Sequence, residues 1–292
     1  MLRRNLLQTL FAPQVAPAQP APANDFHFSI LGDRTGSAQP QIYGRTLREI
    51  AMLSPDFVIN VGDSIQGHDD AKTDLQWQEV KAIWAKHITQ MHYSLAGNHD
   101  VWDDRSAALY TRHTGFPLHY SFLHQNALFV MLDNSRSDAP DASEVRFLEA
   151  ELTRHAQAAP KVVFFHKPFW ETPLSKGDSS FPLHAILRKH GVGHVICGHR
   201  HKFIRYVKDG IAYMACGSSG GDMNGKLLRG EGFAQGCFYH HIWVRVKGPE
   251  IRFTVRELDG MGGHGRMFAA EDWDGAPRFD TGDPGLAGRP ST

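Results

Sequence analysis

The chain has 292 residues, of which 41% are hydrophobic, and its 31 Lys and Arg residues balance its 31 Asp and Glu residues. This describes an ordinary globular protein, and the length suits one large α/β domain. A zero net charge excludes general binding to nucleic acid or to anionic membranes. No stretch reaches the roughly 18 continuous apolar residues of a membrane span. Cys197 and Cys216 lie in apolar, strand-like contexts, so we expect buried free thiols.

Residues 1–24 indicate a leader that precedes the fold. Arg3 and Arg4, followed by two leucines and an Ala/Pro-rich segment, resemble a bacterial twin-arginine export signal. Gln8 and Pro13 interrupt the short apolar region, so a disordered cytosolic leader is the alternative. We expect a mature fold that begins near Asp25 and a periplasmic or secreted protein, with a cytoplasmic location as the alternative.

The first half of the chain alternates short apolar runs with amphipathic segments. The runs at residues 26–31, 57–61 and 92–96 are rich in β-forming residues and predict buried strands. Apolar residues at helical spacing predict helices over residues 42–53 and 75–87. This alternation indicates βαβ units and a parallel sheet.

The second half adds hairpins to the strands and helices. Turns are expected at Gln125-Asn126, Asp209-Gly210 and Gly248-Pro249. The pattern also predicts helices over residues 143–155 (with Ser143 as N-cap) and 183–190, and strands over 161–165 and 194–197. Residues 259–292 hold many Gly, Asp and Pro residues and predict an irregular tail. The two halves together suggest an α/β fold of two mixed sheets packed face to face, with helices outside.

Five polar blocks follow the predicted strands. In chain order they are Gly32-Asp33-Arg34-Thr35-Gly36, Gly62-Asp63, Gly97-Asn98-His99-Asp100, His166 and Gly198-His199-Arg200-His201. Side chains that follow parallel strands converge on one edge of a sheet. Carboxylate, amide and imidazole donors without thiolate suit Mn, Fe, Zn or Mg. The blocks therefore predict a metal-dependent hydrolase. Asp133-Asn134 also ends a strand but matches no ligand block, so we assign it a structural role.

The order of these blocks resembles the calcineurin-like metallophosphoesterases, whose motifs are D-x-H, G-D, G-N-H-[DE], a lone His and G-H-x-H. The resemblance covers residues 26–258, which we expect to form the catalytic domain. It implies a four-layer α-β-β-α sandwich and two divalent metal ions (Mn, Fe or Zn). It also implies a water-mediated attack on a small-molecule phosphate monoester or diester.

The resemblance implies a role for each block. Asp63 would bridge two cations, of which Asp33 and His201 would bind the first, and Asn98, His166 and His199 the second. His99 would donate a proton to the leaving group. Asp100 would hold the other ring nitrogen of His99 and raise the pKa of that histidine. Arg34 is a candidate to contact a phosphate oxygen, with a surface ion pair as the alternative.

Two local patterns predict how the backbone presents these side chains. Gly97 and Gly198 would let the chain turn sharply where each strand ends. In an extended Gly-His-Arg-His segment alternate residues point the same way, so His199 and His201 would face the metals and Arg200 would point away.

The first block departs from the family pattern. Thr35 stands where the family usually has a histidine ligand. Purple acid phosphatases also lack this histidine but carry a tyrosine three residues after the second aspartate, where this chain has Gln66. We therefore expect a first metal site that is weaker, more open to water or occupied by a different ion. His68 follows the Asp63 loop and is a candidate to fill the vacancy.

Two tryptophans bear on the substrate. Trp102 and Trp170 follow the third and fourth blocks, and although core packing is the default for tryptophan, they are candidates to wall the cleft and stack on an aromatic group. A nucleotide phosphodiesterase is therefore one alternative function. A non-catalytic metal-binding module with a degenerate first site is another.

Overall fold

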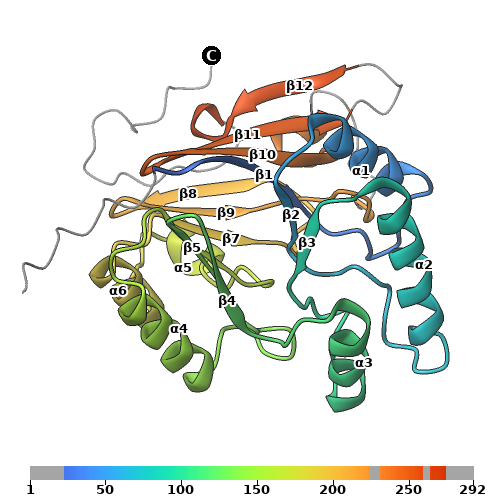
Figure 1. Cartoon of the computed structure of the whole chain (residues 1–292), viewed down its shortest axis with the longest axis horizontal. Helices are drawn as coiled ribbons and strands as arrows, with labels where there is room; N and C mark the ends of the chain where they lie inside the picture. Colours follow the sequence, from blue (N-terminus) through green and yellow to red (C-terminus); the bar gives the residue numbers. More distant parts are fainter. Residues whose placement is uncertain (1–22, 224–230, 259–263, 274–292) are drawn as a thin grey trace, which may run out of the picture.

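The computed structural model describes residues 23–223, 231–258 and 264–273, which form two six-stranded sheets and their flanking helices (Figure 1). The first sheet contains β1 (Asp25–Leu31), β2 (Phe57–Asn60), β3 (Met91–Ser94), β10 (His240–Lys247), β11 (Glu250–Leu258) and β12 (His264–Ala269). The second contains β4 (Tyr120–His124), β5 (Ala127–Met131), β6 (Lys161–Phe164), β7 (His194–Cys197), β8 (Ile204–Lys208) and β9 (Ile211–Ala215). The helices are α1 (Ile42–Leu53), α2 (Thr73–His87), α3 (Asp104–Thr114), α4 (Ala142–Arg154), α5 (Glu171–Ser175), α6 (Pro182–Lys189) and α7 (Glu231–Ala234), with a 3-10 turn at Ala270–Asp272.

Both sheets are mixed. The strand orders are β12-β11-β10-β1-β2-β3 and β4-β5-β6-β7-β9-β8. Parallel pairing joins β1, β2 and β3 in one sheet and β5, β6, β7 and β9 in the other. The remaining pairs are antiparallel, and they include the central β1–β10 pair of the first sheet. The parallel strands are the ones that the polar blocks follow, so their carboxyl ends bring the blocks to one region of the molecule.

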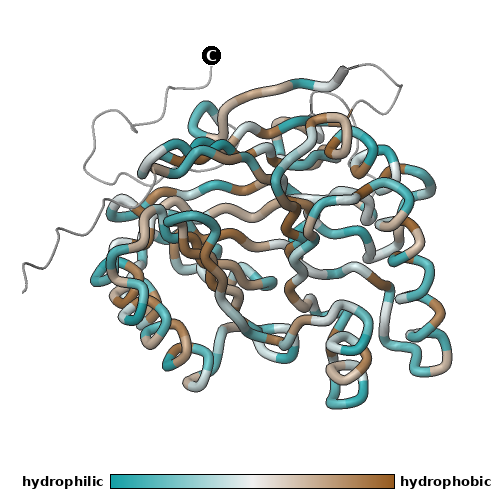
Figure 2. The backbone as a smooth tube through the Cα atoms, viewed as in Figure 1, coloured by the Kyte–Doolittle hydropathy of each residue, from teal (hydrophilic) through white to brown (hydrophobic). Residues whose placement is uncertain are grey.

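Three apolar clusters hold four layers together. The central cluster lies between the sheets, where Phe28 packs edge-to-face on Phe129 at 5.3 Å between ring centroids. A second cluster joins the first sheet to α1, α2 and α3, and includes the fully buried Trp77. A third joins the other sheet to α4, α5 and α6. Figure 2 shows the hydrophobic residues on the strands and the inward faces of the helices. This confirms the α/β sandwich of α-β-β-α layers.

The expected elements are largely present. The helix over residues 42–53 has the predicted bounds, and the three predicted hairpins form between β4 and β5, β8 and β9, and β10 and β11. Asp209 and Gly210 both have positive φ, 51° and 79°, as a two-residue hairpin turn requires. The N-cap of α4 is Asp141, not Ser143, because the Asp141 carboxylate accepts hydrogen bonds from the backbone N–H groups of Ser143 and Glu144.

Part of the predicted irregular tail is regular. Strand β12 pairs antiparallel with β11, and Trp273 beyond it is buried. The ring of Trp273 lies 5.4 Å from that of Phe203 and 5.7 Å from that of Phe238. The stretch has few aromatic side chains, but those it has close one end of the central core. Residues 1–22 of the predicted leader (residues 1–24) and residues 259–263 and 274–292 of the predicted tail lie outside the described residues.

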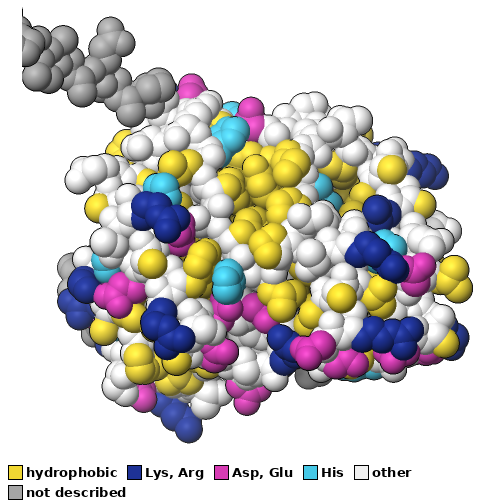
Figure 3. Space-filling model, turned by 60° about the horizontal axis from the view of Figure 1, so that its bottom comes forward, with side chains coloured by type: hydrophobic (Ala, Val, Ile, Leu, Met, Phe, Trp, Pro, Cys, Tyr) yellow, Lys and Arg dark blue, Asp and Glu magenta, His cyan; other side chains and the backbone are white. Residues whose placement is uncertain are grey.

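The surface carries both apolar and charged regions. No helix within residues 23–223, 231–258 or 264–273 is long and apolar enough to cross a membrane. Figure 3 brings the bottom of Figure 1 forward and shows hydrophobic side chains gathered in the middle of that face, with charged side chains around them. At the open edges of the sheets, Tyr93 of β3 and Phe122 of β4 stack at 3.8 Å and are only partly buried.

We predict that Trp273→Ala lowers the free energy of unfolding by about 3–5 kcal/mol, since it leaves a cavity in the central core. Met267→Ala is the matched control, because Met267 lies on the neighbouring β12 and is 64% exposed. Urea unfolding of both variants measures the difference. Equal small effects from the two variants would mean that this end of the chain does not contribute to the core.

Candidate metal centre

Two buried aspartates lie at the ends of neighbouring parallel strands. Asp33 follows β1 and Asp63 follows β2, and both side chains are almost fully buried. The backbone N–H groups of Arg34 and Thr35 donate to the carbonyl oxygen of Asp63, both at 3.1 Å, and join the two loops. Backbone N–H groups also hold the carboxylates: that of His199 donates to Asp33 (2.8 Å) and that of His99 to Asp63 (2.9 Å). The carboxylates are therefore fixed before any ligand binds.

Backbone carbonyl groups orient two histidines toward these carboxylates. Nδ1 of His166 lies 2.8 Å from the carbonyl oxygen of Val61, and its Nε2 lies 3.2 Å from Oδ2 of Asp63. Nδ1 of His201 hydrogen-bonds the carbonyl oxygen of Asp222, and its Nε2 lies 3.3 Å from Oδ2 of Asp33. A carbonyl partner on Nδ1 leaves Nε2 free as a metal ligand, an arrangement that metal-binding histidines commonly use.

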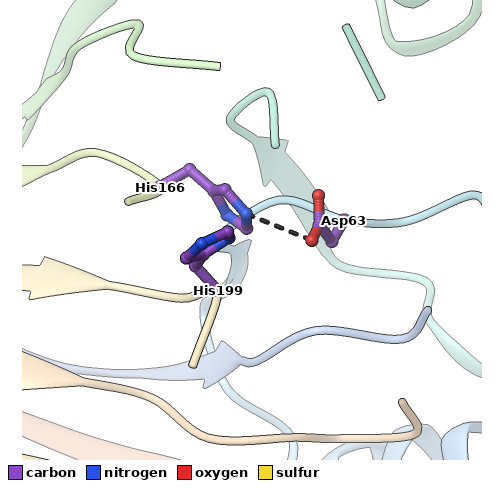
Figure 4. A group of neighbouring side chains, drawn as sticks. All are labelled: Asp63, His166 and His199. Atoms are coloured by element: carbon purple, nitrogen blue, oxygen red, sulfur yellow. Dashed lines mark ion pairs between the residues drawn. The ribbon is translucent and has the colours of Figure 1, made fainter. Parts of the chain in front are cut away.

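The ionisable side chains form two groups that share one carboxylate. We call Asp33, Asp63 and His201 the first group, and Asp63, His166 and His199 the second group. Within each group the ligand atoms lie within 4.8 Å of one another. Figure 4 shows the second group, in which His166 and His199 come from the loops after β6 and β7 and approach Asp63. Every member of these groups is a residue that the resemblance implied as a ligand, with Asp63 as the shared member, and Asn98 is the one implied ligand outside them.

Two buried polar atoms support a cation at this place. Oδ1 of Asn98 and Nε2 of His166 are buried without a hydrogen-bond partner among the described residues, although the latter lies near Asp63. Leaving such an atom unpaired costs about 1–3 kcal/mol, so natural structures rarely do so without a reason. Carboxylate, amide and imidazole donors together suit Mn, Fe or Zn. The residues present therefore fit two divalent cations.

The electrostatics favour positive charge in the centre. Burial would raise the pKa of Asp63, but the adjacent His166 holds it well below its usual range. Burial would lower the pKa of His166, but the carboxylates of Asp63 and Asp33 raise it to about 9. Burial raises the pKa of Asp33, which the hydrogen bond from His201 opposes. Buried negative charge that attracts protons in this way also attracts metal cations.

The calcineurin-like phosphoesterase family matches residues 23–203, which include all five blocks. The chain belongs to this family. Its fold is similar to that of many solved structures, three of which come from yellow lupin, Plasmodium and Danio rerio. The purple acid phosphatase PPD1 from yellow lupin seeds has a TM-score of 0.62 and 13% identity, over 89% of this chain and 55% of that protein. This chain thus spans about half the length of the lupin enzyme.

The other two structures cover more of their own length. GAP50 of Plasmodium, described as the anchor in the inner membrane complex, has a TM-score of 0.60 and 17% identity, over 84% of this chain and 88% of that protein. A dimetal phosphatase from Danio rerio has a TM-score of 0.55 and 14% identity, over 84% and 98%. At these identities the likeness shows the fold alone. No curated protein matches the chain.

The backbone presents the family's ligands differently from our expectation. Asp63, His199 and His201 have φ values of 54°, 75° and 49°, in the left-handed region that residues other than glycine rarely adopt. His199 and His201 therefore lie in bends after β7 and not in an extended segment, so strand alternation does not explain why both face the centre. Such strain persists where the surroundings enforce it, and it is common at functional sites.

We had expected Gly97 and Gly198 to allow a sharp turn. They instead allow a neighbouring carboxylate to approach the backbone closely. Neither has a positive φ. A Cβ atom at Gly97 would lie 2.2 Å from Oδ1 of Asp63, and one at Gly198 would lie 2.5 Å from Oδ1 of Asp33. Each glycine therefore makes room for the carboxylate of a neighbouring loop.

Asp100 does not hold His99, so the expected hydrogen bond between them is wrong. The buried Asp100 accepts hydrogen bonds from the backbone N–H groups of Ser64 (2.8 Å), Ile65 (3.1 Å) and Gly97 (3.0 Å). Nδ1 of His99 instead lies 2.6 Å from the carbonyl oxygen of Gln66. Asp100 thus connects the second and third blocks through their backbone, and burial raises its own pKa to about 7.

The contacts of Arg34 support the alternative of an ion pair and not a contact with a phosphate oxygen. Its guanidinium pairs with Glu79 of α2 and donates to the carbonyl oxygen of Ser64 at 3.0 Å. The Arg34 side chain is only 10% exposed, whereas the Glu79 side chain is 62% exposed, so the pair connects a buried guanidinium to a carboxylate at the surface.

The two positions that depart from the family patterns contact each other. Oγ1 of Thr35 donates to Oε1 of Gln66 at 2.7 Å, and Gln66 also accepts from the backbone N–H of Ser37 at 3.0 Å. His68 does not fill the vacancy, because it belongs to neither group. Its ring lies against those of His99 (5.3 Å) and Trp102 (4.9 Å). The first group thus offers three ionisable ligands among the described residues.

The tryptophans differ in their surroundings. Trp170 is fully buried, donates to Sγ of Cys197 at 3.2 Å and packs on Tyr213 at 5.5 Å, so it belongs to the core and does not wall the cleft. Trp102 is only partly buried.

The three cysteines are free, and Cys197 and Cys216 are buried, as expected.

Sequence reasoning did not recognise what Asn134 does at the site. Its Oδ1 accepts hydrogen bonds from the backbone N–H groups of His166 (2.9 Å) and Lys167 (3.0 Å), and so fixes the loop that carries a ligand. Its position at the end of a strand was the available signal. The carbonyl partners of His166 and His201 carry no sequence signal, because any residue supplies a backbone carbonyl.

We predict that Thr35→His strengthens metal binding to the first group by about tenfold or more, because it adds an imidazole donor beside three existing ligands. Calorimetric titration of the metal-free protein with Zn²⁺ and Mn²⁺ measures this. Thr35→Val is the control, since it removes the contact with Gln66 without adding a donor, and it should not tighten binding. An unchanged affinity in folded Thr35→His would contradict a vacancy at this position.

Proposed function

We propose that this protein hydrolyses phosphate esters of small molecules with the help of two divalent cations. The observation that carries the proposal is the pair of ligand groups that share the buried Asp63. Two cations in such a site activate water for attack on phosphorus and neutralise the phosphoryl charge. Asp33 and His201 would hold the first cation, and Asn98, His166 and His199 the second, with Asp63 between them.

His99 is the residue best placed to protonate the leaving oxygen. Its backbone N–H donates to Asp63, which keeps it at the centre, and its side chain is only partly buried. Because Nδ1 contacts the carbonyl oxygen of Gln66, Nε2 is the atom left to deliver a proton. The carbonyl of Gln66 thus takes the orienting role that we had expected of Asp100.

The alternatives have less support. A stacking pair of tryptophans would have favoured a nucleotide phosphodiesterase, but Trp170 lies in the core. A non-catalytic metal-binding module would explain Thr35 in place of a ligand. The oriented His99 favours catalysis, because a site that only stores a metal needs no proton donor. Assays with both monoesters and diesters separate these functions.

We predict that the chain, freed of metal with EDTA and reloaded with Mn²⁺, Fe²⁺, Zn²⁺ or Mg²⁺, hydrolyses 4-nitrophenyl phosphate or bis(4-nitrophenyl) phosphate. Asp63→Asn should lower kcat by more than about 10²-fold and reduce the bound metal, because both groups lose their shared carboxylate. Metal analysis and the absorbance of nitrophenolate measure the two effects.

Asp104→Asn is the matched control for this substitution, because Asp104 is fully exposed on α3 and should keep full activity. Hydrolysis that survives in a folded Asp63→Asn protein would contradict the shared-carboxylate site.

We predict that His99→Gln lowers kcat by about 10²–10⁴-fold, the usual contribution of a general acid, and leaves the metal content unchanged. The loss should be smaller for an ester whose alcohol leaves readily than for an alkyl phosphate, since a good leaving group needs less protonation. A loss of metal together with activity would show instead that His99 is a ligand.

A further inference from the structure

A cavity of about 410 Å³ opens beside His201. Its lining includes Glu171 at the start of α5, Arg200 and Lys202 on either side of His201, and Tyr206 on β8. Because His201 belongs both to this lining and to the first group, the cavity lies next to the metal centre.

The cavity carries more positive than negative charge. Nε of Arg200 lies 2.5 Å from one carboxylate oxygen of Glu171, and Nζ of Lys202 lies 3.4 Å from the other. One carboxylate therefore faces two cations. Burial, together with Glu171, raises the pKa of Tyr206, so this side chain stays neutral. Glu171 is 16% exposed, whereas Arg200 and Lys202 are 44% and 39% exposed and remain accessible from the cavity.

We propose that this cavity binds a second acidic group, a carboxylate or another phosphate, on the alcohol portion of the substrate. The proposal rests on the proposed function, which places the ester phosphate at the metal centre. A substrate that extends past His201 would bring its second anion to the guanidinium and ammonium groups. An arginine fork favours planar or tetrahedral oxyanions.

Glu171 has two effects in this arrangement. It holds the two cationic side chains at the cavity, which lowers the entropy cost of binding an anion. It also competes with that anion for the same donors. An isolated surface ion pair would have neither an excess cation nor a cavity leading to a ligand group, and would contribute little.

The experiment compares the affinity of the protein for non-hydrolysable phosphonate analogues of an ester that differ only by the second acidic group. Phenylphosphonate, its 3- and 4-carboxylated derivatives and 1,4-phenylenebisphosphonate are titrated calorimetrically into the Zn²⁺-loaded protein. We expect at least one of the doubly acidic compounds to bind about tenfold more tightly than phenylphosphonate. Comparing the carboxylated compounds with the bisphosphonate shows whether the cavity prefers a carboxylate or a second phosphate group.

Substitutions in the cavity lining test which side chains cause the difference in affinity. Lys202→Gln and Arg200→Gln should each reduce the ratio of affinities between the doubly acidic compound and phenylphosphonate, and Glu171→Gln should increase it by removing the competing carboxylate. Lys176→Gln is the matched control, because Lys176 lies just after α5 and outside the cavity lining, and it should keep the ratio. Raising NaCl from 50 to 500 mM should reduce the ratio in the wild type.

Two outcomes would overturn the proposal. One is equal affinity of the wild type for all four compounds; the other is a ratio that Lys202→Gln and Arg200→Gln leave intact. The proposed function is tested separately by hydrolysis of phenyl phosphate. If the protein binds a doubly acidic compound more tightly than phenylphosphonate but hydrolyses no ester, the proposed hydrolase function is refuted and the proposed anion-binding cavity stands.

Discussion

The buried carboxylate of Asp63 is the interaction on which the site depends. The carboxylate accepts a hydrogen bond from the backbone N–H of His99 and faces Nε2 of His166. The backbone carbonyl oxygen of Asp63 accepts hydrogen bonds from the backbone N–H groups of Arg34 and Thr35. A buried charge is expensive unless it is paired and hydrogen-bonded. The loops after four different strands therefore meet at this group, and their arrangement places two sets of candidate metal ligands around it.

The two-sheet architecture makes this convergence possible. The carbonyl oxygen of Val61, just past β2 of the first sheet, accepts from His166, which follows β6 of the second. The backbone N–H of Gly198 donates to the carbonyl oxygen of His166 and aligns the last block with the fourth. Because the central cluster fixes the sheets against each other, the strained conformations of Asp63, His199 and His201 are held by the fold.

The departures from the family pattern concentrate on the first group. Thr35 and Gln66 hydrogen-bond each other at the positions where the resemblance implied a ligand, so this side of the centre has fewer candidate donors than the resemblance implied. The proposed anion cavity opens beside the same group, through His201. Fewer protein ligands and an adjacent positive pocket both suit a site in which the substrate itself contributes oxygen atoms.

The sequence by itself determined the family, the four layers, the three hairpins and the residues that gather at the centre, because strand and turn signals are local and the blocks keep a fixed order. Tertiary structure alone decided which atoms meet. The carbonyl oxygen of Gln66 and not the carboxylate of Asp100 orients His99, and Trp170 packs into the core. It also decided that Trp273 closes the central core. Contacts to backbone carbonyls and packing between distant aromatics leave no periodic pattern, so they become visible only when the chain is folded.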